Sequence, residues 1–451
     1  MESMNGTFSY PFQAHLGEKL ADSLTAPLPV GTPRRVFGAL RVPGKVTAVV
    51  GMRRAGKTMF LHQIQRERLA AGVVRERMPY INFEDERLAG LTAEHLHPLV
   101  EDYYRRFPRL RGRETVIWCF DEIQVVPGWE RFVRRLLDSE QVEVFLTGSS
   151  AALLSREIAT ALRGRAWEVV IHPFSFEEAL WHGGQTVPEQ PDFLNAPARS
   201  MLEKAFLDYL VAGGFPEAQR LDTATRYQLL RDYVDVAMLR DVVERHAVGN
   251  VAGQRWLVRH LLSNAAGLFS LEKFYRALKS QGLAISRDTV HQFMGHLQDC
   301  FLVRTVWMES TSERQRMVNP RKAYPVDPGL IPVFDRTGRS NLGHALETVV
   351  LLELERRRAE VTYVKTPQGF EVDFLARYPS GEVDLIQVCA EADSPETAER
   401  ELRALMEAGR LFPRAHKRLL TLTRDGLPRQ VSADVLAQPA YVWLLTPAES
   451  S

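Results

Sequence analysis

The sequence predicts an α/β protein of several domains, the first of which is built on a parallel sheet. Three short apolar runs support this prediction, at 46–50, 116–120 and 142–146, and segments of helical pattern separate them. Each run leads into glycine or polar residues, as strands do when their carboxyl ends form a functional edge of a sheet. A chain of 451 residues exceeds what one hydrophobic core usually organises, so we expect two or three domains.

Composition and charge exclude several classes of protein. The chain is 45% hydrophobic and 25% charged, and its net charge of +1 gives no bulk attraction to nucleic acid or to an anionic membrane. Residues 1–29 lack the layout of a signal peptide, and no apolar run reaches the roughly 18 residues that span a bilayer. We therefore expect a cytoplasmic protein with no membrane partner. The three cysteines are too sparse for a disulfide framework or a structural zinc site.

The segment after the first apolar run, residues 51–58, matches the phosphate-binding loop pattern G-x-x-x-x-G-K-[ST]. Glycines let the backbone approach phosphate oxygens closely, and the following helix (59–69) presents its positive end to them. Lys57 is expected to reach the β- and γ-phosphates, and the Thr58 hydroxyl to bind Mg²⁺. The predicted nucleotide-binding residues are Gly51, Arg53, Arg54, Ala55, Gly56, Lys57, Thr58 and Met59.

The second apolar run ends in two carboxylates, Asp121 and Glu122. We predict that Asp121 joins Thr58 as a metal residue and that Glu122 is the catalytic base that polarises the attacking water. An acidic strand end alone is common and does not identify a site. Its place downstream of a phosphate-binding loop makes the prediction specific.

Polar residues also follow the third apolar run. Thr147 or Ser149 would hold the attacking water or sense the γ-phosphate, while Ser150 is equally suited to cap a helix at 151–162. That helix ends near Arg163 and Arg165. Either arginine would reach a neighbouring subunit's γ-phosphate in a homo-oligomer; the alternative is a solvated basic helix end.

Six motifs in order carry a family resemblance. They are the phosphate-binding loop, Phe120–Gln124 with Trp129, Leu146–Ser150, Leu162–Arg165, Pro173–Glu178 and Gly213–Glu217. From about residue 30 onward, the chain resembles a group of uncharacterised bacterial and archaeal AAA-type ATPases with a C-terminal domain of unknown function. The resemblance implies an AAA+-like core of five parallel strands with a small helical lid, and ATP as the nucleotide. It implies no particular substrate.

The middle of the chain has the layout of a winged helix. Residues 220–262 are helical in pattern, and they precede an amphipathic helix at 269–279, a glycine turn, a helix at 287–297 capped by Ser286, and a strand at 301–307. On DNA, the groove-facing residues would be Arg287, Thr289, His291 and Gln292, with Arg276 and Lys279 on phosphates. A basic wing would comprise Arg314, Arg316, Arg321 and Lys322, unless it is a solvated loop. Such modules also serve in protein packing.

The last part of the chain resembles the restriction-endonuclease-like fold. A helix (342–358) carries Glu347, and strands are expected at 362–365, 369–375, 383–389, 419–423 and 441–445. The positions that match the nuclease motif are Glu347, Asp373, Gln387 and Cys389.

Active members of that fold carry an acid and a lysine where this chain has Gln387 and Cys389. We therefore expect a nuclease-like fold without nuclease activity. Lys365 on the neighbouring strand is a candidate replacement for the missing lysine. Glu371 and Asp373 are alternatively a hydrogen-bonded structural pair.

These observations predict an N-terminal extension (1–30), an AAA+-like ATPase core with its lid (31–220), a helical and winged-helix domain (221–335) and an inactive nuclease-like domain (336–451). We expect ATP hydrolysis with Mg²⁺ that repositions C-terminal modules for binding DNA or protein. The alternatives are a nucleotide-gated switch for a protein partner and an ATP-regulated nuclease.

Overall fold

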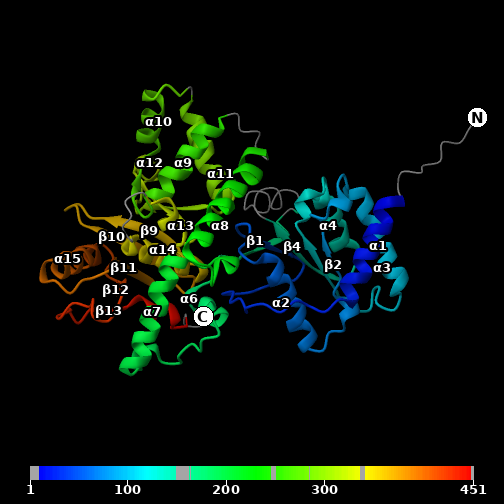
Figure 1. Cartoon of the computed structure of the whole chain (residues 1–451), viewed down its shortest axis with the longest axis horizontal. Helices are drawn as coiled ribbons and strands as arrows, with labels where there is room; N and C mark the ends of the chain where they lie inside the picture. Colours follow the sequence, from blue (N-terminus) through cyan, green and yellow to red (C-terminus); the bar gives the residue numbers. More distant parts are fainter. Residues whose placement is uncertain are drawn as a thin grey trace, which may run out of the picture. The chain divides into compact units, whose positions relative to one another are not determined.

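A computed structural model shows the chain as two compact units, Met1–Ile171 and His172–Ser451 (Figure 1). The residues that the structure describes are 10–148, 162, 164–244, 250–283, 285–335 and 341–447. The two units are described separately below. The finer domain boundaries near 220 and 335 stay a prediction.

The first unit contains a five-stranded sheet in the order β2-β3-β4-β1-β5, with every pair of neighbours parallel. Its strands are β1 (Val46–Val50), β2 (Tyr80–Asn82), β3 (Val116–Asp121), β4 (Val142–Gly148) and β5 (Ala166–Val170). All residues of β1 and β3 are buried, because helices cover a parallel sheet on both faces. The parallel sheet of the predicted AAA+-like core is confirmed.

Helices surround this sheet. They are α1 (Tyr10–Thr25), α2 (Lys57–Ala70), α3 (Leu96–Arg106) and α4 (Trp129–Ser139), with short 3-10 turns at Arg75–Arg77, Glu86–Leu88, Ala93–His95 and Ile123–Val125. In α4, Trp129, Phe132, Val133 and Leu136 are buried at the spacing of one helix face. The helix predicted at 151–162 lies outside the described residues, except for Leu162.

The second unit is organised by an eight-stranded mixed sheet in the order β13-β12-β11-β10-β9-β7-β8-β6. Its strands are β6 (Leu268–Phe269), β7 (Val303–Met308), β8 (Arg321–Pro325), β9 (Glu360–Lys365), β10 (Glu371–Arg377), β11 (Val383–Cys389), β12 (His416–Thr421) and β13 (Val435–Pro439). A short parallel pairing, Trp307 with Thr362 and Met308 with Tyr363, joins β7 to β9. Strands expected in two separate domains therefore form one continuous sheet.

The helices of the second unit are α6 (Phe176–His182), α7 (Ala196–Ala212), α8 (Thr223–Val236), a π-helix (Ala237–Glu244), α9 (Val251–Ser263), α10 (Leu271–Ser280), α11 (Arg287–Asp299), α12 (Glu313–Val318), α13 (Leu330–Phe334), α14 (Leu342–Arg356), α15 (Pro395–Leu411) and α16 (Ala440–Leu445), with 3-10 turns at Pro191–Phe193 and Pro216–Ala218. The Ser286 hydroxyl accepts a hydrogen bond from the Thr289 amide at 3.0 Å, so Ser286 caps α11 as expected.

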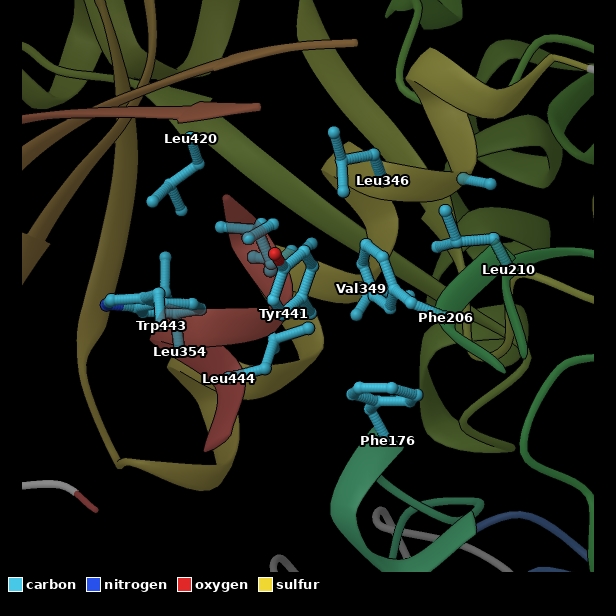
Figure 2. Packing of buried hydrophobic residues seen from close by; sticks show 14 of the residues in the cluster. Phe176, Phe206, Leu210, Leu346, Val349, Leu354, Leu420, Tyr441, Trp443 and Leu444 are labelled. Carbon is cyan, nitrogen blue, oxygen red and sulfur yellow. The ribbon is translucent and has the colours of Figure 1, made fainter. Parts of the chain in front are cut away.

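One large hydrophobic core connects the first and last helices of this unit. Phe176 of α6 and Phe206 of α7 pack in the same cluster as Val349 of α14, and Tyr441 and Trp443 of α16 complete it (Figure 2). Buried rings of Phe206 and Tyr441 meet edge to face, with centroids 6.1 Å apart. The segment that was expected to form the lid of the ATPase core thus shares its hydrophobic core with the C-terminal helices α14 and α16.

The strand predicted at 441–445 is wrong, because these residues form α16. The preceding residues Val435–Pro439 form the edge strand β13 instead. A short, uniformly apolar run is compatible with a buried strand and with a buried helix, and its hydrophobic pattern does not separate the two. Here Pro439 caps the helix, and all six helix residues are buried.

Two consecutive glycines fix a crowded backbone crossing in the second unit. Gly213 has φ 76°, and a Cβ atom there would lie 1.8 Å from Asp327 Oδ1. A Cβ atom on Gly214 would lie 2.2 Å from the Phe174 carbonyl oxygen. The buried Asp327 carboxylate accepts hydrogen bonds from the amides of Gly214 (2.6 Å) and Gly329 (2.9 Å). Only glycine fits at these positions of the predicted motif Gly213–Glu217.

The buried Asp327 carboxyl group leads to a prediction of pH-dependent stability. Burial raises the pKa of Asp327 to about 7. Because this pKa is raised in the folded state, the contribution of Asp327 to stability is lost as pH rises through about 7. From pH 5 to pH 8.5 we expect the free energy of unfolding to fall by on the order of 2 kcal/mol more in the wild type than in Asp327→Asn. Urea titrations of both proteins check this. Parallel pH profiles would contradict it.

Candidate nucleotide-binding site

The predicted phosphate-binding loop connects β1 to α2 and depends on its two glycines. Gly51 has φ 146° and Gly56 has φ 103°, both conformations that other residues rarely adopt. A Cβ atom on Gly51 would lie 2.2 Å from the carbonyl oxygen of Ile171. Gly56 is the N-cap of α2, and it places the positive end of the helix dipole at the loop.

Lys57 lies folded over this loop. Its side chain is buried, and its Nζ donates hydrogen bonds to the carbonyl oxygens of Gly51 (3.1 Å) and Met52 (3.2 Å). The same Nζ lies 4.0 Å from Glu122 Oε1. The ammonium group is therefore held next to the turn whose backbone would surround a phosphate.

Asp121 brings three strands and a helix together. Its Oδ2 accepts hydrogen bonds from the Thr58 hydroxyl (2.9 Å) and the Tyr80 hydroxyl (2.7 Å), and its Oδ1 accepts one from the Thr147 hydroxyl. The two residues predicted to hold Mg²⁺, Thr58 and Asp121, are thus in direct contact. Both offer hard oxygen atoms, which are the ligands that Mg²⁺ prefers.

Thr147 fixes the position of the acidic pair. While its hydroxyl donates to Asp121, it accepts a hydrogen bond from the Glu122 amide at 2.8 Å. This arrangement commits the Thr147 hydroxyl to the two acids. The other candidate at this strand end, Ser149, lies outside the described residues.

Glu122 combines backbone strain with burial. Its φ of 53° lies in the left-handed region, which is uncommon for a residue with a side chain. Burial raises the pKa of Glu122, and the Lys57 ammonium counteracts part of the effect. Gln124 donates a hydrogen bond to Glu122 Oε2. A carboxylate with a raised pKa is a better proton acceptor at neutral pH than an exposed one.

Sequence reasoning missed Tyr80 and Arg34. Tyr80 begins the strand next to β3, so the parallel order of the sheet would have been needed to place it. Arg34 comes from the segment before β1, and its guanidinium donates to the Ala55 carbonyl oxygen at 2.7 Å. Its backbone amide and carbonyl also bond the Gln63 side chain of α2. These hydrogen bonds hold the segment before β1 against the phosphate-binding loop. No local sequence pattern predicts them.

Of the two arginines predicted to reach a neighbouring subunit, the structure describes only Arg165. Arg165 is about half exposed and forms an ion pair with Asp138. Arg163 lies outside the described residues. Arg53 pairs with Glu84 at 2.9 Å beside the loop.

The residues expected on DNA lie on α10 and α11. Their side chains are exposed at Arg276, Lys279, Arg287, His291 and Gln292, whereas Thr289 is half-buried. Arg276 and Arg287 both pair with Glu272, at 2.9 Å and 3.0 Å.

The predicted basic wing is wrong for two of its members. Lys322 is 4% exposed and lies among acidic side chains of α14 and β10. The Arg321 guanidinium lies 3.5 Å from the centre of the Trp307 ring. Both residues belong to β8, where strand alternation and the join to β9 decide which side chains are covered.

Gln387 and Cys389, which match the nuclease motif in the sequence, both form hydrogen bonds with residues outside that motif. Gln387 donates a hydrogen bond to Glu401 at 2.7 Å, and the Cys389 thiol donates to the Glu391 carbonyl at 3.1 Å. Burial raises the pKa of Cys389 to about 11, so the thiol is neutral at physiological pH. Lys365, the candidate replacement, is exposed. Within the described ranges no group of three or more His, Cys, Asp or Glu is placed to hold a metal ion.

None of the helices in the described part of the chain has both the length and the apolarity that crossing a bilayer requires.

Comparison with known proteins places these features in context. A family model described as "AAA domain" matches residues 43–180, and one described as "Domain of unknown function (DUF8612)" matches residues 203–340. The chain is 32% identical over 416 residues to the uncharacterised protein MJ1544 of Methanocaldococcus jannaschii, covering 90% of this chain and 89% of that protein. It is 28% identical over 347 residues to an uncharacterised protein of Haemophilus influenzae, covering 77% of this chain and 82% of that protein.

Two solved structures align with the chain at low TM-scores. The Walker-type ATPase PABY2304 of Pyrococcus abyssi aligns with a TM-score of 0.39 at 18% identity, over 71% of this chain and 95% of its own. The Aeropyrum pernix Orc1 protein in complex with DNA aligns with a TM-score of 0.28 at 16% identity, over 74% of this chain and 93% of its own.

The close approach at Gly51 gives a stability prediction with a matched control. Gly44 also has a positive φ, of 73°, but nothing lies within 4 Å of a Cβ atom there. Gly44→Ala should therefore cost only the backbone strain, about 1 kcal/mol, whereas Gly51→Ala adds a clash with backbone and should cost at least about 3 kcal/mol. Urea unfolding of both variants measures the difference. Equal losses would show that the Ile171 contact does not constrain the loop.

Proposed function

The chain belongs to a family of uncharacterised archaeal and bacterial proteins with an AAA domain, and from this premise we propose that it binds ATP with Mg²⁺ and hydrolyses it to ADP and phosphate. The observation that carries the proposal is the convergence of Lys57, Thr58, Asp121 and Glu122. They come from the start of α2 and the end of β3. Thr58 contacts Asp121 at 2.9 Å, and the Lys57 ammonium lies 4.0 Å from Glu122 Oε1. A glycine-rich loop that binds nothing would not require a buried lysine opposite two buried carboxylates.

Each residue has a distinct part in the proposed reaction. The Lys57 ammonium and the loop amides hold the phosphates and offset the negative charge that develops on them. Thr58 and Asp121 would hold Mg²⁺, which adds charge stabilisation at the β- and γ-phosphate oxygens. Glu122 accepts the proton of the attacking water, and Thr147 keeps Glu122 in position. Arg163 or Arg165 of a neighbouring copy would complete the site in a homo-oligomer.

We also propose that the nucleotide cycle is coupled to DNA through α9–α11 and the strands β6, β7 and β8. The three strands are ordered β6-β8-β7, and α10 and α11 lie between β6 and β7 in the sequence, which is the arrangement typical of a winged helix. The exposed cationic side chains Arg276, Lys279 and Arg287 support a nucleic-acid partner. An ATP hydrolysis rate that does not change when DNA is added would favour a protein partner instead.

The proton acceptor gives the first functional prediction. Glu122→Gln keeps the shape and the hydrogen bond from Gln124 but cannot take a proton. We expect ATP affinity within about threefold of the wild type and turnover reduced about 100-fold or more. Fluorescent-nucleotide titration and a phosphate-release assay measure the two quantities. Lys57→Ala serves as the control that loses binding as well. A Glu122→Gln variant that keeps a tenth of the turnover would rule out this role.

The DNA proposal gives the second functional prediction. Lys279→Ala combined with Arg287→Ala should weaken duplex DNA binding about tenfold at low salt and lower its salt dependence. The matched control is Arg231→Ala combined with Lys204→Ala, which removes two exposed cations from α8 and α7. Fluorescence anisotropy at several salt concentrations measures binding, and ATP turnover with single-stranded, duplex and branched DNA measures coupling. Equal effects of both double variants would contradict a DNA surface on α10 and α11.

A further inference from the structure

A buried lysine stands at the centre of three carboxylates in the second unit. Lys322 of β8 places its Nζ 2.8 Å from Asp373 Oδ1, 2.9 Å from Glu371 Oε1 and 3.1 Å from Glu347 Oε1. An ammonium group has three N–H donors and no acceptor. Two of these contacts are hydrogen bonds, to Glu347 and Asp373, and the third is an ion pair with Glu371.

The acids are themselves held in place by other groups. The Tyr324 hydroxyl donates to Glu347 Oε1 at 2.6 Å, and the Val388 amide donates to Asp373 Oδ2 at 2.9 Å. Lys322, Glu347 and Asp373 are each less than 10% exposed, while the Glu371 side chain is 32% exposed. Carboxylates buried to this extent need a cation close by, because desolvation alone would cost several kcal/mol per charge.

The lysine and the acids come from different parts of the fold. Glu347 lies on α14, and Glu371 and Asp373 lie on one face of β10, whereas Lys322 arrives on the strand β8 of the predicted winged helix. The pairing of β7 with β9 makes this possible, because it joins the two groups of strands into one sheet. Glu347 and Asp373 are the two acids at positions that resemble a nuclease motif in the sequence.

We propose that the Lys322 ammonium is the resident cation of this cluster, and that it keeps divalent metal ions out of the position between Glu347, Glu371 and Asp373. Lys322 occupies the point where the three carboxylates converge, so a metal ion would have to displace the lysine and break its three ion pairs. Lys322 also ties β8 to α14 and β10 by charge.

The first test uses the wild-type protein and Mn²⁺ as the probe, without nucleotide. Electron paramagnetic resonance counts bound Mn²⁺ in the wild type and in Asp373→Asn. We expect the two titrations to coincide, since any Mn²⁺ that binds near Thr58 and Asp121 is common to both. A wild-type site that disappears in Asp373→Asn would overturn the proposal.

The second test removes the lysine charge with little change of shape. Lys322→Met should gain one Mn²⁺ site with an affinity at least about tenfold above that of the wild type, and Mn²⁺ should raise its melting temperature. The matched control is Lys365→Met, which removes an exposed lysine from the neighbouring strand and should gain no site. The gain should vanish in Lys322→Met combined with Asp373→Asn. A folded Lys322→Met protein that binds no additional Mn²⁺ would overturn the proposal. The wild-type titration remains decisive should Lys322→Met fail to fold.

Discussion

The hydrogen bonds to the Asp121 carboxylate are the interaction on which the nucleotide site depends. This fully buried side chain accepts from hydroxyl groups on α2, β2 and β4, so one charged group fixes the relative positions of the helix and both strands that flank β3. The parallel register supplies the geometry, because Asn82 and Asp121 are paired and the carboxyl ends of the strands meet at one edge. Without that register the phosphate-binding loop would have no carboxylate opposite it.

The two units stabilise a buried carboxylate in different ways, and the difference bears on chemistry. Asp121 is surrounded by neutral hydroxyls, which donate hydrogen bonds and leave the negative charge available to an incoming cation. Asp373 is instead next to an ammonium group that neutralises it permanently at physiological pH, because ion pairing holds the pKa of Lys322 above its usual range despite burial. The hydroxyl groups around Asp121 suit a site that binds a cation. The ammonium group beside Asp373 suits a cluster whose role is to stabilise the fold.

The sequence was sufficient for features that local patterns encode. The bounds of β1 and β11 were predicted to the residue, because each is a mostly apolar run that follows a turn containing proline and glycine. Lys57, Thr58, Asp121 and Glu122 were predicted as one site because their motifs have a fixed order. Long-range features were not accessible: Arg34, Tyr80 and Lys322 reach their partners across strand pairings that no local pattern reports. From the sequence alone, Lys322 is indistinguishable from an exposed lysine. Its burial can be inferred only once the pairing of β7 with β9 is known.

The join between β7 and β9 also determines how the second unit can be divided. Two pairs of residues connect β7 to β9. Without this pairing, both strands would be sheet edges with unpaired backbone N–H and C=O groups. A chain cut between residues 335 and 341 would leave two open sheet edges, each a template for intermolecular association, and would separate a buried ammonium from its carboxylates. The helices α10 and α11 and the strands β9 to β13 therefore belong to one structural unit. Truncation that separates them would expose both sheet edges, which favours intermolecular association.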